Sequence, residues 1–181
     1  FKVSNDIQFH LEQTVFERMS LEDRMTGVKN RKAFEQCIEE IQEAGILLKN
    51  VLLLFIHIDG LKKINDMNGM QMGDEVVIRT ARSIQIAGKS LEPDAESFRV
   101  NGNEFAVVVV NPQKLPEEWE KVILNELKKE IGSRCRIELK FGYSYLREKD
   151  GTLQSVSDWK MQADKMLCLN TGKSVEDRYD L

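Results

Sequence analysis

The sequence predicts an α/β (α+β) domain in which helices flank a mostly antiparallel central sheet. Apolar residues recur at helical spacing in several segments, and two strand-like runs flank the turn-forming triplet at residues 101–103. Two further strand-like runs alternate with the helical segments. The expected order is helix, strand, helix, hairpin, helix, strand, helix, preceded by a helix that enters the domain.

The entering helix is expected over residues 6–19. Thr14 and Arg18 stand where a strict heptad repeat would place hydrophobic residues, so the apolar stripe is incomplete. The segment therefore fits either a coiled coil or a linker helix docked on the domain. Its apolar positions at roughly helical spacing are Ile7, Leu11, Val15 and Phe16.

The first helix and strand of the domain have clear end signals. Asn30 can cap a helix that ends at Gly45. Residues 51–58 are a continuous apolar run, short enough for a strand buried on both faces. A period of two puts Phe55, His57 and Asp59 on one side of that strand. The buried face of the helix would carry Ala33, Phe34, Cys37, Ile38 and Ile41.

The middle of the chain predicts a helix, a hairpin and another helix. Residues 74–87 have a helical pattern, with Gly88 at the end. Residues 96–100 and 104–110 are the arms of the hairpin. Pro116 opens the next helix, because the first helical position does not need its missing N–H. That helix would bury Trp119, Val122, Ile123, Leu127 and Ile131.

The C-terminal part predicts a strand and a final helix. Apolar and polar residues alternate over residues 137–145, which is typical of a strand open to solvent on one face. The final helix is expected over about residues 157–169. The apolar positions of the strand are Ile137, Leu139, Phe141, Tyr143 and Tyr145.

Composition excludes several classes of protein. A formal charge of −4 and an isoelectric point near 5.4 give no general attraction for nucleic acid. No apolar run approaches the roughly 20 residues of a membrane-spanning helix. The cysteines at 37, 135 and 168 are odd in number and widely spaced, which indicates a reducing cytosol rather than disulfides or a zinc site. Because the chain starts with Phe1, we expect a piece of a longer protein.

Several short motifs occur in a fixed order. Residues 23–34 read DRMTGVKNRKAF, residues 57–66 read HIDGLKKIND, residues 69–74 read GMQMGD and residues 99–105 read RVNGNEF. Ala163 and Asp164 begin a further match. Together they resemble the GGDEF family of diguanylate cyclases. The resemblance covers about residues 23–174 and rests on the order and spacing of the set, since any one motif is weak.

The resemblance implies a nucleotide-cyclase palm fold. In active members, a homodimer apposes two half-sites and condenses two GTP molecules into cyclic di-GMP. The expected division is a linker or signalling helix over residues 1–22, a GGDEF-like domain over 23–175 and a charged tail over 176–181.

The resemblance also shows which metal ligands have changed. In active relatives, Mg²⁺ is held by side chains at the positions of His57 and Asn103 and by the backbone carbonyl at the position of Ile58. Imidazole and a neutral amide replace two carboxylates, which are the ligands that Mg²⁺ prefers. We therefore expect no metal cofactor and loss of the activity that depends on it. The alternative is an active site that uses Asp59 and Glu104 with Mg²⁺ or Mn²⁺, or with zinc favoured by His57; otherwise His57 is a histidine hydrogen-bonded at a strand end.

Two positions for reading guanine are retained. Asn65 and Asp74 stand where the family places the amide and the carboxylate that contact the base, and both groups suit its edge. Otherwise Asn65 organises a turn and Asp74 caps a helix. Lys62 matches a phosphate-binding lysine of the family. Lys173 replaces an arginine only across a gap of about two residues.

Other departures from the family motifs also indicate an inactive site. Met70 replaces a histidine of the family, and Asn101 replaces the first glycine of the name-giving motif. Asparagine tolerates positive φ, so the turn itself is expected to survive. The product-inhibition motif reads EPDA at residues 92–95, without its arginine. Feedback binding of cyclic di-GMP there is therefore not expected.

The sequence leaves three functions to weigh. The first is an inactive GGDEF module in bacterial signalling that regulates or binds a guanine nucleotide such as GTP. The second is an active cyclase or nucleotide hydrolase with an unusual metal, and the third is a purely structural dimerisation module. The expected partners are a second copy or an upstream sensor domain of the same chain. The expected location is cytoplasmic, within a larger membrane-associated or sensor protein.

Overall fold

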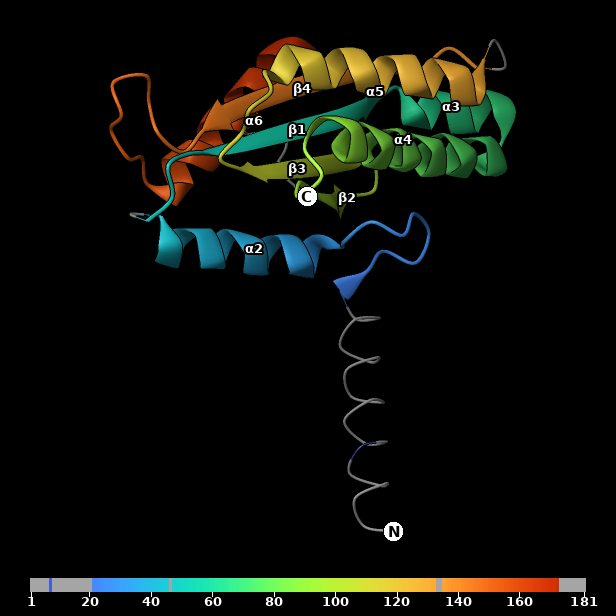
Figure 1. Cartoon of the computed structure of the whole chain (residues 1–181). Helices are drawn as coiled ribbons and strands as arrows, with labels where there is room; N and C mark the ends of the chain where they lie inside the picture. Colours follow the sequence, from blue (N-terminus) through green and yellow to red (C-terminus); the bar gives the residue numbers. More distant parts are fainter. Residues whose placement is uncertain (1–6, 8–20, 46, 133–134, 173–181) are drawn as a thin grey trace.

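The computed structural model describes residue 7 and residues 21–45, 47–132 and 135–172 (Figure 1). Its helices and strands follow the predicted order, with one additional helix, α3. The elements are α2 (Arg31–Ala44), β1 (Val51–Asp59), α3 (Leu61–Asn68), α4 (Met70–Leu91), β2 (Glu96–Asn101), β3 (Glu104–Val110), α5 (Pro116–Ile131), β4 (Glu138–Tyr145) and α6 (Val156–Thr171).

The described strands form one antiparallel sheet in the order β2-β3-β1-β4. Strand β1 is central and pairs with β3 on one side and β4 on the other. The connection through α3 and α4 joins β1 to β2, and α5 joins β3 to β4. This is the split βαβ arrangement with a central hairpin. The predicted mixed fold with an antiparallel sheet is confirmed.

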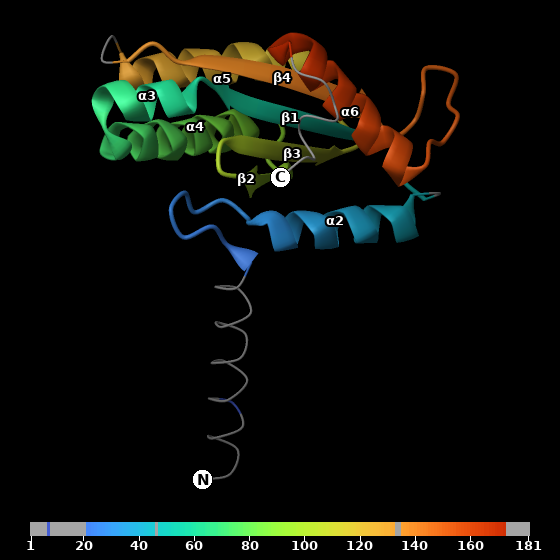
Figure 2. The same ribbon diagram turned by 180° about the vertical axis from the view of Figure 1, so that it is seen from behind.

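Helices cover both faces of the sheet. In both views α5 and α2 lie on opposite sides of it (Figures 1 and 2). One face of β1 contributes Leu52, Leu54 and Ile56 to a core shared with α4 and α5. The other face contributes Leu53 and Phe55 to a core shared with α2 and α6. The continuous apolar run therefore predicted a strand buried on both sides correctly.

The capping of α2 follows the prediction. The Asn30 side chain accepts a hydrogen bond from the Ala33 N–H, at 3.1 Å, and the helix ends at Ala44 with Gly45 as its C-cap. Phe34 on this helix packs edge-on against Phe98 of β2, with ring centroids 5.4 Å apart. The contact fixes α2 beside the hairpin that carries the candidate site.

The prediction that one face of β4 is open to solvent was wrong. Helix α6 lies on that face, where Gly142 and Ser144 are buried. The Ser144 hydroxyl donates to the Trp159 carbonyl at 2.6 Å, and the Trp159 indole donates to the Ser144 carbonyl at 3.2 Å. The small and polar residues that looked solvent-facing are those that let a helix backbone approach the strand closely.

Three predictions around α3 and α4 also need correction. Residues 61–68 form helix α3, so Asn65 lies on a helix and does not organise a turn. Lys62 lies on the same helix. Helix α4 begins at Met70, so Asp74 lies in its second turn and does not cap it. Gly88 does not end α4, which continues to Leu91. A methyl group at this interior position would meet the Trp119 ring of α5 at 3.7 Å, an ordinary contact distance, so packing does not require glycine there.

Some predictions fall outside the described residues. The entering helix over residues 6–19 is described only at Ile7, and the tail over 176–181 is not described. Within the described ranges, no helix is both long and apolar enough to cross a membrane.

Candidate functional site

The candidate site lies where β1 ends beside the β2–β3 turn. His57 on β1 is the direct cross-strand partner of Glu104 on β3. The His57 Nδ1 atom lies 3.1 Å from Glu104 Oε1, and both side chains are buried. The other carboxylate oxygen of Glu104 accepts a hydrogen bond from the Asn101 amide at 2.9 Å. Glu104 is therefore engaged on both oxygens by neighbouring side chains.

Asn103 is bonded to the backbone of Ile58. Its carbonyl accepts from the Ile58 N–H at 2.9 Å, and its side-chain amide donates to the Ile58 carbonyl at 3.3 Å. That carbonyl is the oxygen which the family resemblance assigns to a metal ion. In this chain, the side-chain amide of Asn103 donates a hydrogen bond to that oxygen.

The turn itself is held by an arginine. Arg99 donates to the Gly102 carbonyl at 2.8 Å and to Asp23 Oδ1 at 3.2 Å. Asn101 is not among the described residues with positive φ, so the turn does not need the left-handed conformation that we expected asparagine to supply. The arginine therefore ties the β2–β3 turn to the segment that precedes α2.

Asp23 organises that preceding segment. Burial raises the pKa of its carboxyl, but hydrogen bonds from Thr26 and Arg99 and the charge of Arg99 outweigh burial, so the pKa is lowered. Because the folded pKa lies below the unfolded value, the carboxylate stabilises the fold above that unfolded value of 3.8. This contribution is lost as the pH falls below it.

These contacts do not leave a site for Mg²⁺. The three positions that the resemblance assigns to the metal are His57, Ile58 and Asn103. They are bonded to Glu104 or to one another, and none supplies an anionic oxygen. In the parts of the chain that the structure describes, no group of three His, Cys, Asp or Glu side chains could hold a metal ion. The residues present therefore do not fit the metal ion that the family implies.

The predicted guanine-reading residues meet at the corner between α3 and α4. The Asn65 amide packs against Gly73, where an added Cβ would lie 1.7 Å from Asn65 Oδ1. Within the described structure, that buried oxygen has no hydrogen-bond partner. Asp74 follows Gly73 directly and is exposed, as is Lys62 on α3. Lys173 lies outside the described residues.

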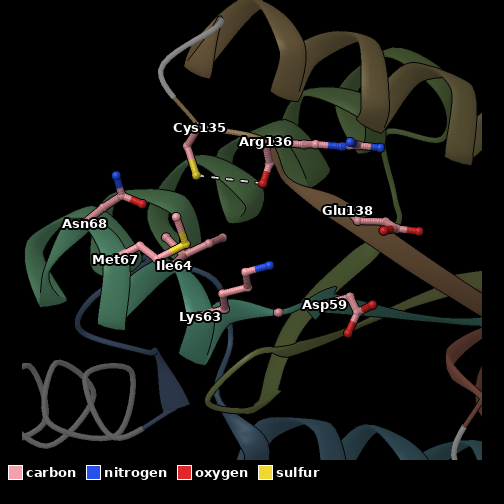
Figure 3. Close-up of a pocket in the computed structure, with 9 residues that line it drawn as sticks. Asp59, Lys63, Ile64, Met67, Asn68, Cys135, Arg136 and Glu138 are labelled. Atoms are coloured by element: carbon pink, nitrogen blue, oxygen red, sulfur yellow. Dashed lines mark hydrogen bonds between the residues drawn. The ribbon is translucent and has the colours of Figure 1, made fainter.

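A pocket of about 520 Å³ lies on another side of α3 (Figure 3). Lys63, Ile64 and Met67 on α3 face the segment that carries Cys135 and Arg136. Asp59 lines this pocket, whereas Asn65 and Asp74 do not. The structure therefore separates Asp59 from the two residues expected to read the base. The remaining lining residues are Gly60, Asn68 and Glu138.

Lys140 is a residue at this site that the sequence did not indicate. It is the direct cross-strand partner of His57 on the β4 side. Its ammonium group makes an ion pair with Glu138, which is itself opposite Asp59. The hydrogen bond with Glu138 raises the pKa of Lys140, burial lowers it by less, and the charges of Glu138 and then Asp59 raise it further. A register between strands far apart in sequence has no local signal, so only the structure could place it here.

The fold and the positions of these residues define a palm-like domain of the nucleotide-cyclase type. Residues 20–172 match the family model described as "Diguanylate cyclase, GGDEF domain". The chain therefore belongs to the GGDEF family.

Relatives and solved structures agree with this assignment. The chain is 34% identical over 136 residues to the probable diguanylate cyclase DgcJ of Escherichia coli K12, covering 70% of this chain and 26% of DgcJ. It thus spans about a quarter of that relative's length. The coiled coil and GGDEF domain of DgcB from Caulobacter crescentus, in complex with c-di-GMP, superposes with a TM-score of 0.68 at 25% identity, covering 95% of this chain and 91% of that one.

A second structure is similar in fold alone. The diguanylate cyclase SiaD from Pseudomonas aeruginosa, in complex with its activator SiaC, has a TM-score of 0.68 and 20% identity. The match covers 94% of this chain and 66% of SiaD.

Proposed function

We propose that this domain is an inactive GGDEF module that regulates cyclic di-GMP signalling in bacteria, with a guanine nucleotide as its ligand. The observation that carries the proposal is the set of internal hydrogen bonds that joins His57 to Glu104 and Asn103 to Ile58. Phosphoryl transfer needs a cation to offset charge on the triphosphate. A site whose ligand positions bond to one another does not offer that cation a place.

The nucleotide part of the proposal rests on the α3–α4 corner. The Asn65 oxygen is a buried acceptor without a partner, and a buried polar atom left unpaired costs free energy. The exposed Asp74 carboxylate, one residue beyond Gly73, can accept the adjacent N–H donors of guanine. A donor-rich base edge bound at this corner would therefore give hydrogen-bond donors to both residues.

The proposal extends to partners and location. A second copy of this chain or a sensor domain of the same protein would transmit the signal through the segment that precedes residue 21. The module would act in the cytoplasm, where GTP is available. An active cyclase or hydrolase that uses Asp59 and Glu104 remains the second candidate, but Glu104 is already engaged by His57 and Asn101.

Turnover is the first experiment. The purified chain is incubated with GTP and Mg²⁺, Mn²⁺ or Zn²⁺, and the products are analysed by mass spectrometry beside an active GGDEF domain. We expect no cyclic di-GMP and no GTP hydrolysis above the rate without protein. Production of cyclic di-GMP with Mg²⁺ alone, at a rate like that of the active domain, would overturn the proposal that this domain is inactive.

Binding is the second experiment. Calorimetric titration is expected to show GTP binding more tightly than ATP, by at least about tenfold, because adenine lacks the paired N–H donors. Asp74→Asn should remove most of this preference by removing the carboxylate. Equal affinities for GTP and ATP, or no heat with either, would leave only a scaffold function.

Gly73→Ala tests the Asn65 position without changing a polar group. An added methyl would overlap Asn65 Oδ1 and force that flexible side chain to rotate. Alanine also favours the helix by about 1 kcal/mol, so thermal stability should change little. We expect GTP affinity to fall at least about tenfold. GTP affinity equal to that of the natural chain would show that Asn65 does not contact the base.

A further inference from the structure

We infer that Lys140 supplies the positive charge at this end of the sheet and excludes a divalent cation from it. The inference rests on the proposed function, because it explains why the site differs from a metal-binding one. It adds a third position to the two that the family resemblance identifies, His57 and Asn103. Restoring carboxylates at those two positions would therefore not restore metal binding.

The strand register places Lys140 beside the first metal position. In an antiparallel pair, directly opposite residues lie on the same face with Cβ atoms about 4.5–5.5 Å apart. His57 is opposite Glu104 on β3 and opposite Lys140 on β4. A carboxylate and an ammonium group thus flank residue 57 in one row across three strands.

The next row contains the two carboxylates that interact with the positive charge of Lys140. Asp59 is opposite Glu138, and Lys140 makes its ion pair with Glu138. The charge of Asp59 also stabilises the ammonium form of Lys140. The Lys140 side chain is only 25% exposed, so solvent screens these interactions incompletely. Lys140 therefore offsets part of the negative charge of Asp59, at the end of β1, and of Glu138, at the start of β4.

A divalent ion bound at residue 57 would lie in the same row of side chains as Lys140, its direct cross-strand neighbour. Repulsion between a double and a single positive charge about 5 Å apart, the spacing of directly opposite residues, weakens binding by at least about tenfold even at the dielectric constant of water. A carboxylate introduced at residue 57 would also attract the Lys140 ammonium group. That group would then pair with the carboxylate in place of a metal ion. Both effects disfavour metal binding as long as the lysine is present.

Manganese binding tests the inference directly. The double variant His57→Asp/Asn103→Asp is compared with a triple variant that adds Lys140→Met, using calorimetry with Mn²⁺ and no nucleotide. We expect the triple variant to bind Mn²⁺ at least about tenfold more tightly than the double variant. Adding Lys121→Met instead, at an exposed position on α5, should leave the affinity of the double variant unchanged. Equal Mn²⁺ affinity of the double and triple variants, or no binding by a folded triple variant, would overturn the inference.

A second pair of variants covers a failure to fold. His57→Asp places a carboxylate beside the buried Glu104, which can unfold the domain. Asn103→Asp with and without Lys140→Met keeps the contact between His57 and Glu104 and makes the same comparison. The same criteria apply: tighter Mn²⁺ binding without the lysine supports the inference, and equal or absent binding overturns it.

The failure of this inference can be distinguished from the failure of the proposed function. If the double variant with Lys140 in place binds Mn²⁺ as tightly as the triple variant, this inference fails while the natural chain can still be inactive. If the natural chain produces cyclic di-GMP, the proposed function fails whatever the manganese comparison shows.

Discussion

Gly142→Ala is expected to lower the free energy of unfolding by about 3 kcal/mol. An added Cβ would lie 2.4 Å from both the Ala163 carbonyl oxygen and the Leu167 nitrogen. These atoms belong to the backbone of α6, so they cannot rotate away as the end of a side chain can. Urea denaturation followed by circular dichroism measures the loss, and we expect a lower midpoint with an unchanged slope.

Gly88→Ala is the matched control for this prediction. The same methyl group added in α4 would meet the Trp119 ring at 3.7 Å, an ordinary contact distance. Because alanine favours a helix interior over glycine, this variant should gain about 0.5–1 kcal/mol. Opposite signs for the two variants would show that close packing of α6 on β4 is the cause. A loss of similar size in both would mean that the backbone overlap at Gly142 is not what destabilises the variant.

The sequence predicted most of the fold because its strongest signals are local. The apolar run of β1, the Asn30 cap and the alternation in β4 each depend on neighbouring residues. Helix α3 was missed because it has only 8 residues, which is too short for a stable isolated helix. It is held in place by Ile64, which is buried in the core beneath it. Such tertiary stabilisation leaves little trace in a short sequence window.

The candidate site was predictable in part, because its motifs are also local sequence signals. Motif positions indicated that His57, Ile58 and Asn103 belong together, and the structure brings them together. Their partners were not predictable, because the amide bond to the Ile58 carbonyl and the position of Lys140 depend on strand register. The contact between Asn65 and Gly73 also depends on a corner between two helices. The roles of Asn65, Asp74 and Lys62 remain predictions that the nucleotide experiments test.

His57→Leu is expected to lower the free energy of unfolding by about 2–3 kcal/mol. The substitution removes the group that lies 3.1 Å from Glu104 Oε1 and leaves that buried carboxylate with less hydrogen bonding. Removing one partner of a buried pair costs more than the pair contributes, since the other partner stays desolvated. Chemical denaturation of the natural chain and the variant measures the difference.

The double variant His57→Leu/Glu104→Leu distinguishes a structural pair from two independent residues. When both polar groups are replaced by apolar ones of similar size, no desolvated carboxylate remains, so we expect stability within about 1 kcal/mol of the natural chain. Arg31→Leu, which breaks an exposed pair with Glu35 on α2, should cost less than about 0.5 kcal/mol and is the control for a solvent-screened pair. Losses that simply add in the double variant would mean that the two side chains do not depend on each other. Strong coupling would instead mean that residue 57, which the family resemblance assigns to a metal ion, contributes to folding here, and that a carboxylate placed there must replace this contribution before a metal ion can bind.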